Sequence, residues 1–193
     1  SGLLRAVLDG ADERYTFAST DPAALPLYTR AGMRTRWTLL EMSGPAPLAG
    51  STGAPDLEVR RVDAMAASAA ELEMTGVDRT SAHRYWAARD GAAALVVTGP
   101  EGVVGVAAVA EEASRVGLRI DHLVSADHMA PAVMAAVVGE WAPDRVHAYV
   151  PGSTEFAAWL LAHRFVVDDI SLHMATAGIG VHRLLAVVHP GLG

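Results

Sequence analysis

Four side chains able to bind a metal ion or move a proton lie close together in the second half of the chain. They are Asp121, His122, Asp127 and His128. Imidazole and carboxylate groups are zinc ligands and also general bases. No two histidines have the i, i+4 spacing of a helical zinc site, so we expect a solvated strand end and no metal. The alternative is that Asp121 or His122 lines a pocket and accepts a proton from an amine substrate.

A second group of candidate residues is aromatic and cationic. Tyr85 and Trp86 follow Arg84 and precede Arg89, and they could line a ligand site in a helical region. For the tryptophans of the chain, core packing is the default expectation because their rings bury much apolar surface. Tyr85 and Trp86 are therefore weak candidates for substrate contacts.

Composition excludes several classes of function. The 193 residues include 15 Lys and Arg against 22 Asp and Glu, a net charge of −7, and no basic cluster, which argues against nucleic acid or an anionic membrane as a partner. The absence of cysteine excludes a disulfide framework and a cysteine nucleophile. No apolar run approaches the length of a membrane span and no secretory leader is present, so we expect a cytoplasmic protein.

The elements that must position these residues include a repeated unit. Residues 21–33 predict a short helix that closes at Gly32, between strands at 14–19 and 34–42. Pro26 favours a helix that is kinked or starts late. An offset of 132 residues pairs Met33 with Phe165 and aligns this unit with a later strand, helix and strand at 145–150, 154–163 and 166–175.

The chain is therefore predicted to hold half of one repeat and all of a second. Residues 1–42 would be the C-terminal half of a first domain, 43–55 a linker rich in Pro, Gly and Ser, and 56–193 a complete second domain. By the repeat length, about eighty to ninety residues of the first repeat would precede Ser1. The other elements predicted for the second domain are strands at 57–62, 92–98, 103–111, 117–124 and 182–188 and helices at 64–76, 81–90 and 130–141.

This order of elements resembles the GNAT superfamily of acyl-CoA-dependent N-acetyltransferases. The segment Leu27-Tyr28-Thr29-Arg30-Ala31-Gly32-Met33 resembles that superfamily's pattern of Leu-Tyr, three residues, Gly and a large apolar residue. Ser1-Gly2-Leu3-Leu4 resembles the end of its pyrophosphate loop. The resemblance implies an α/β (α+β) fold with a mixed, mainly antiparallel sheet flanked by helices. It also implies acetyl-CoA as co-substrate and direct attack of an amine on the acetyl thioester.

The same resemblance implies roles for individual residues. Tyr28 would be the catalytic proton donor to the departing thiolate, although simple packing between helix and sheet is the alternative. Ser1, Gly2 and Leu3 would bind the cofactor by offering amides to the pyrophosphate at a helix N-terminus. Asp21 stands where the family often has a cofactor-binding asparagine. An aspartate suits an anionic ligand less well, so a plain helix cap is the alternative.

The second domain departs from the family pattern. Residues 124–134, where the pyrophosphate loop should lie, contain no Arg or Gly but do contain Asp127 and Pro131. Leu160 stands at the position that corresponds to Tyr28. We therefore expect a degenerate copy that does not bind acyl-CoA in the usual way, so that the N-terminal copy carries the chemistry.

Two hypotheses for function follow. The first is a tandem-domain acetyltransferase that acts on an amine of a small molecule or peptide; the net charge of −7 suits a cationic acceptor. The second is a non-catalytic GNAT-fold protein that binds a ligand or dimerises. A half domain would expose apolar sheet surface, which favours pairing in a homodimer.

Overall fold

The computed structural model describes residues 15–47, 56–112, 117–126, 128–176 and 185–187. Its first unit comprises strand β1 (Tyr15–Ser19), helix α2 (Leu25–Arg30) and strand β2 (Arg34–Pro45). Helix α2 starts late, as the sequence predicts, because Pro26 has no amide hydrogen and fits only the first turn. Strand β2 continues to Pro45, so the first three residues of the range predicted as a linker belong to the sheet.

The remaining elements follow in the predicted order, with bounds a few residues from those predicted. The strands are β3 (Glu58–Val62), β4 (Ala92–Gly99), β5 (Gly102–Glu112), β6 (Gly117–Ser125), β7 (Arg145–Pro151), β8 (Val166–Ala175) and β9 (Leu185–Val187). The helices are α3 (Ala64–Thr75), α4 (Thr80–Ala87), α5 (Ala130–Gly139) and α6 (Glu155–Ala162). Within the described ranges, no helix combines the length and apolar character needed to span a membrane.

Local chemistry explains the ends of the helices. The Asp63 carboxylate accepts a hydrogen bond from the amide of Ala66 at the start of α3, and Gly76 ends that helix with a φ of 74°. The Thr154 hydroxyl likewise accepts a hydrogen bond from the amide of Ala157 at the start of α6. Each side chain satisfies a backbone donor that the helix itself leaves unpaired.

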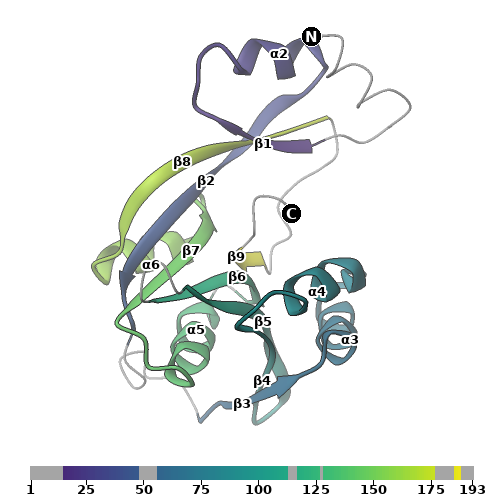
Figure 1. The fold of residues 1–193 in the computed structure, drawn as a ribbon, viewed down its shortest axis with the longest axis vertical. Coiled ribbons are helices and arrows are strands. Elements are labelled where there is room, and N and C mark those ends of the chain that lie inside the picture. The colour runs from purple at the N-terminus through teal and green to yellow at the C-terminus, as the bar shows by residue number, and fades with distance from the viewer. Residues whose placement is uncertain (1–14, 48–55, 113–116, 127, 177–184, 188–193) are drawn as a thin grey trace.

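The described strands form one nine-stranded sheet in the order β1-β8-β2-β7-β6-β5-β4-β3, with β9 beside β6 (Figure 1). The pairing of β6 with β7 is parallel and the other pairings are antiparallel. This is the mixed, mainly antiparallel sheet that the sequence predicts.

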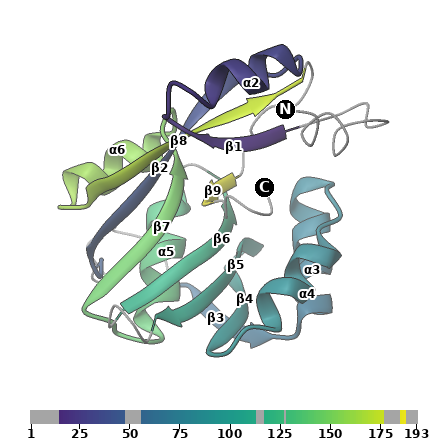
Figure 2. The same ribbon diagram turned by 45° about the horizontal axis from the view of Figure 1, so that its top comes forward.

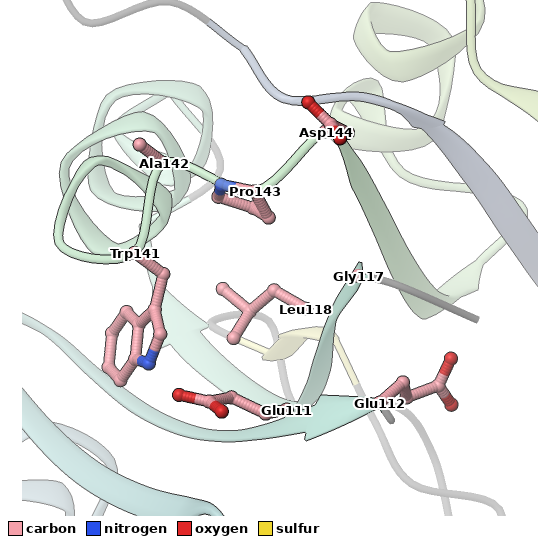
Figure 3. A pocket seen from close by; sticks show the side chains of 8 residues that line it. All are labelled: Glu111, Glu112, Gly117, Leu118, Trp141, Ala142, Pro143 and Asp144. Atoms are coloured by element: carbon pink, nitrogen blue, oxygen red, sulfur yellow. The ribbon is translucent and has the colours of Figure 1, made fainter. Parts of the chain in front are cut away.

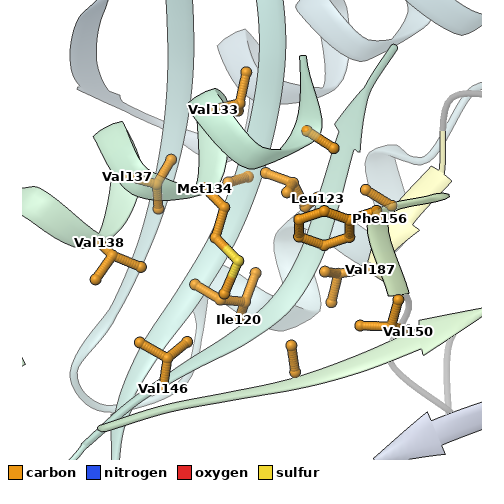
Figure 4. Close-up of a cluster of buried hydrophobic side chains, with 14 of the residues drawn as sticks. Ile120, Leu123, Val133, Met134, Val137, Val138, Val146, Val150, Phe156 and Val187 are labelled. Atoms are coloured by element: carbon orange, nitrogen blue, oxygen red, sulfur yellow. The ribbon is translucent and has the colours of Figure 1, made fainter. Parts of the chain in front are cut away.

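The two faces of the sheet are covered by different helices (Figure 2). Leu95 and Val97 of β4 join the main core with α5 and α6, whereas Ala94 and Val96 pack against α3. Because neighbouring residues of a strand point to opposite faces, the two helix pairs lie on opposite sides of the sheet. The main core contains the completely enclosed side chains of Ile120, Leu123, Val133, Met134, Val137, Val146, Val150 and Phe156 (Figure 4).

The two copies of the repeated unit are interleaved. β8 lies between β1 and β2, and β2 lies between β8 and β7, so neither unit pairs its own two strands with each other. The contact is close: a Cβ on Gly44 of β2 would lie 2.5 Å from the Phe165 ring and 2.9 Å from the Phe165 Cα. Glycine is therefore the residue that lets β2 pass the end of the second unit's helix–strand turn.

Candidate functional site

The sheet opens where β6 and β7 separate. Within the described residues, the two strands pair only from Leu118 to Ile120 of β6, although β6 continues to Ser125 and β7 to Pro151. The register of β6 against β5 passes from Ile120 to His122, which makes Asp121 the extra residue of a β-bulge. Ligands of open sheets bind at the carboxyl ends of diverging parallel strands, so this opening is the candidate site.

Three buried ionisable residues converge beside the bulge. The Oε2 atom of Glu71 on α3 lies 2.7 Å from Nε2 of His83 on α4 and 3.0 Å from Nε2 of His122 on β6. All three residues are about 1% exposed. The expectation of a solvated strand end is thus wrong for Asp121 and His122, because α3 and α4 cover this part of β6. His128 is exposed, and Asp127 lies outside the described residues.

The pKa values follow from these contacts. Burial alone would raise the pKa of the Glu71 carboxyl, but hydrogen bonds from His122 and His83 outweigh burial and lower it from 4.5 to about 2. Burial lowers the pKa of His122 below its ordinary 6.5, against the opposing effect of Glu71. At neutral pH Glu71 is therefore a carboxylate that accepts an N–H hydrogen bond from the neutral imidazole of His122.

Glu71, His83 and His122 carry groups that can bind a metal ion. One ligand atom each of Glu71, His83 and His122 lies within 4.8 Å of the others. However, Nε of Arg79 lies 3.1 Å from the other oxygen of Glu71, which places a positive charge beside the site. Metal-bound imidazoles also donate their second N–H to a partner, whereas the buried Nδ1 of His83 has no hydrogen-bond partner among the residues that the structure describes. Both features favour a hydrogen-bonded cluster over a metal centre.

Asp121 is held by two arginines. Its carboxylate lies 3.0 Å from Nη1 of Arg89 and 2.7 Å from Nε of Arg119, and its side chain is 1% exposed. Arg119 also pairs with Glu112 at 3.1 Å. Both carboxylate oxygens of Asp121 accept hydrogen bonds from guanidinium groups. The structure thus gives Asp121 a structural ion pair at the bulge.

Tyr85 and Trp86 point in different directions from α4. The Trp86 side chain is 2% exposed and stacks on His122, with ring centroids 4.6 Å apart and an interplanar angle of 21°. Tyr85 is 51% exposed. Core packing, the default expectation for Trp86, is what the structure has.

Tyr28 and Asp21, the predicted catalytic residue and one of the predicted cofactor-binding residues, lie in a different part of the molecule. Tyr28 is half-buried on α2, in a cluster with Met33 and Met174 at the β1–β8 end of the sheet. Asp21 is exposed, and its Oδ1 accepts a hydrogen bond from the amide of Ala23 at 2.9 Å, as a turn-stabilising residue does. Ser1, Gly2 and Leu3 lie outside the described residues.

A depression of about 540 Å³ opens at the start of β6 (Figure 3). The Trp141 ring and the carboxylates of Glu111, Glu112 and Asp144 line it. It lies at Gly117 and Leu118, whereas the opening between β6 and β7 begins beyond Ile120, so the depression is separate from the opening.

Sequence reasoning missed Glu71, His83, Arg79 and Arg119. A signal for Glu71 existed, because it lies four residues after Ala67 and three before Met74, and these spacings share one helix face. Nothing in their spacing linked Glu71 or His83 to His122, since only the packing of α3 and α4 on β6 brings them together.

No protein-family model and no functionally curated protein matches the sequence. Solved structures do match. A proposed acetyltransferase from Pyrococcus horikoshii is 12% identical over 99% of this chain, with a TM-score of 0.70. A GCN5-related N-acetyltransferase from Anabaena variabilis is 16% identical over 90% of the chain, with a TM-score of 0.60. One from Kribbella flavida is 20% identical over 90% of the chain, with a TM-score of 0.58.

These likenesses define the fold, which is that of the GCN5-related N-acetyltransferase (GNAT) superfamily. The chain spans 63%, 48% and 45% of the lengths of the three proteins, respectively. Each of them is therefore considerably longer than the part that this chain matches.

Proposed function

We propose that the protein is an acetyl-CoA-dependent N-acetyltransferase that transfers an acetyl group to an amine of a small molecule or peptide. The observation that carries the proposal is the GNAT-type sheet, matched over 99% of the chain in the Pyrococcus horikoshii protein. We assign the cofactor to the first repeat, because Tyr28 and Gly32 of the family pattern occur there and the second copy has Leu160 and Arg164 instead.

The proposed chemistry needs a proton at the leaving group. Acetyl-CoA supplies the thioester: the amine nitrogen bonds to the acetyl carbon, the carbon–sulfur bond breaks, and the amine gives up a proton to solvent, which balances the proton that the sulfur atom receives. Tyr28 would donate a proton to the departing sulfur atom. Its half-buried ring, packed against Met33, would hold the phenol in one orientation. Asp21 would stabilise the turn that leads into α2.

A titration of acetyl-CoA by calorimetry, followed by assays with a panel of amines, tests this proposal. It should use the protein at its natural length, with the 193-residue chain as a second sample. We expect Tyr28→Phe to lower kcat by about 100-fold with acetyl-CoA affinity retained. Tyr15→Phe, which removes a hydroxyl from a 45% exposed tyrosine, is the matched control and should leave kcat unchanged.

The second candidate function is a non-catalytic GNAT-fold protein that binds a ligand or dimerises. The ion-paired Asp121 and the enclosed Leu160 favour it for the second copy. If the natural-length protein does not bind acetyl-CoA at millimolar concentration, the enzyme proposal fails and this alternative replaces it.

A further inference from the structure

The separation of β6 from β7 frees one edge of β6, and the chain's own last described strand pairs with it. Leu123 pairs with Val187 and Val124 pairs with Leu185, both antiparallel. These β6 positions lie beyond Ile120, the last residue that pairs with β7. β9 therefore occupies the place at which the parallel pair has opened.

β9 is part of the core and does not lie on the surface. Ala186 and Val187 are 1% and 0% exposed and belong to the main hydrophobic cluster. Figure 4 shows Val187 beside Phe156 and Val150, between the diverging strands. Burial of these side chains stabilises the position of β9, because exposing a valine of this kind costs about 1.5 to 3 kcal/mol.

We propose that the opening between β6 and β7 is a strand-accepting site whose ligand class is extended polypeptide, and that Leu185–Val187 of the same chain occupies it and excludes acyl-CoA from the second repeat. This inference rests on the proposed function, since it explains why only the first repeat would bind acetyl-CoA. An acyl-CoA has amides along its extended arm, and an amide-bearing ligand that paired with this edge of β6 would compete with β9 for it.

The start of α5, next to the opening, is also unsuited to a pyrophosphate. The amides of Met129 and Ala130 already donate to the carbonyl of Ala126, at 2.8 and 3.0 Å. Pro131 has no amide to donate. The donors that a helix N-terminus normally offers to an anion are therefore used or missing at three successive positions.

A disulfide-trapping experiment tests the occupant directly, because the chain has no native cysteine. The full chain carrying Leu123→Cys and Val187→Cys should oxidise to an intramolecular disulfide, measured by intact mass as the loss of two hydrogen atoms. A control pair, Leu123→Cys with Val103→Cys, should stay reduced, because Val103 lies opposite Thr98 at the far end of β5. Circular dichroism confirms that each variant is folded. A folded double variant that forms no disulfide overturns the strand-accepting site.

The stoichiometry of acetyl-CoA binding tests the exclusion. The natural-length protein should bind one acetyl-CoA per chain, and two would overturn the inference. No binding would overturn the proposed function instead, while the disulfide would still decide whether β9 occupies the site. The two failures are thus distinguishable.

Discussion

The helices of the two repeated units end with the same hydrogen bonds but with different side chains. In the first unit the amide of Met33 donates to the carbonyl of Tyr28, and in the second the amide of Phe165 donates to Leu160, both at 3.1 Å. The residue before each amide has a positive φ, 84° at Gly32 and 68° at Arg164. The comparison teaches that this backbone turn persists where its glycine and its tyrosine have both been replaced.

The two helices differ in what they bury. α6 has a side-chain cap at Thr154 and buries Phe156, Ala157 and Leu160, whereas α2 has no side-chain cap and no fully buried residue. The helix of the second copy therefore contributes Leu160 to the hydrophobic core. The helix of the first copy leaves the equivalent side chain, Tyr28, partly accessible. A position that packs completely cannot also reach a ligand, so the difference in burial separates a structural copy from a candidate chemical one.

The largest expected effect on stability comes from truncating the equivalent residues of the two helices, Leu160 and Tyr28, to alanine. Leu160→Ala should lower the free energy of unfolding by about 3 to 4 kcal/mol, because it opens a cavity in the core. Tyr28→Ala should cost about 1.5 kcal/mol, because that side chain is only half-buried. Urea unfolding followed by circular dichroism measures both. Equal losses would contradict the contrast between the copies.

Acid should weaken the packing of α3, α4 and β6 more than the packing of residues 15–47. Among residues 15–47 no ionisable side chain is buried, whereas α3, α4 and β6 bury Glu71, His83 and His122. Glu71 has a pKa lowered from 4.5 to about 2, so its stabilising effect is present above pH 4.5 and is lost as pH falls towards 2. The shift corresponds to about 3 kcal/mol. Burial also lowers the pKa of His122, so stability should begin to fall below its ordinary 6.5.

Unfolding free energies measured across this pH range check the acid effect. Glu71→Gln should be less stable at neutral pH and should show a flatter decline in acid, because its side chain no longer carries the charge that protonation removes. Glu73→Gln, on the exposed face of the same helix, is the matched control and should follow the parent protein. If both variants decline like the parent, Glu71 does not cause the acid sensitivity.

The smallest expected effect concerns the helix-ending residues. Gly32→Ala should cost about 1 kcal/mol, because its φ of 84° strains a residue with a Cβ, while no described residue beyond its two chain neighbours comes within 4 Å of that Cβ. Arg164→Gly should stabilise the protein by up to about 1 kcal/mol for the same reason. Thermal unfolding of the two single variants measures whether each raises or lowers the melting temperature. A change in the same direction in both would show that side-chain contacts outweigh backbone strain.

The sequence predicts the elements well because their signals are local. Strand β8 has the predicted bounds, and the late start of α2 follows from Pro26 alone. The position of Gly32 predicts where α2 ends. Such signals depend on residues that are close in sequence. The alternation of apolar and polar residues, helix capping and proline all act within one or two helical turns.

The interleaved sheet and the buried cluster could not be predicted in this way. The partner of Phe17 is His173, and that pairing has no local signal. Asp121 and His122 follow a strand pattern that ends beside polar residues, so they resemble a solvated end until α3 and α4 cover them. The bulge at Asp121 likewise depends on the neighbouring strand and not on its own sequence.

The interleaved order also determines when the sheet can close during synthesis. β1 pairs with β8, and β2 pairs with β7 and β8, so the strands that leave the ribosome early have described partners that leave it late. Pairings between such distant segments form slowly, because a long stretch of chain must be ordered first. These pairings of the first unit can therefore form only after the second unit has left the ribosome, which makes the closing of this part of the sheet a late step of folding.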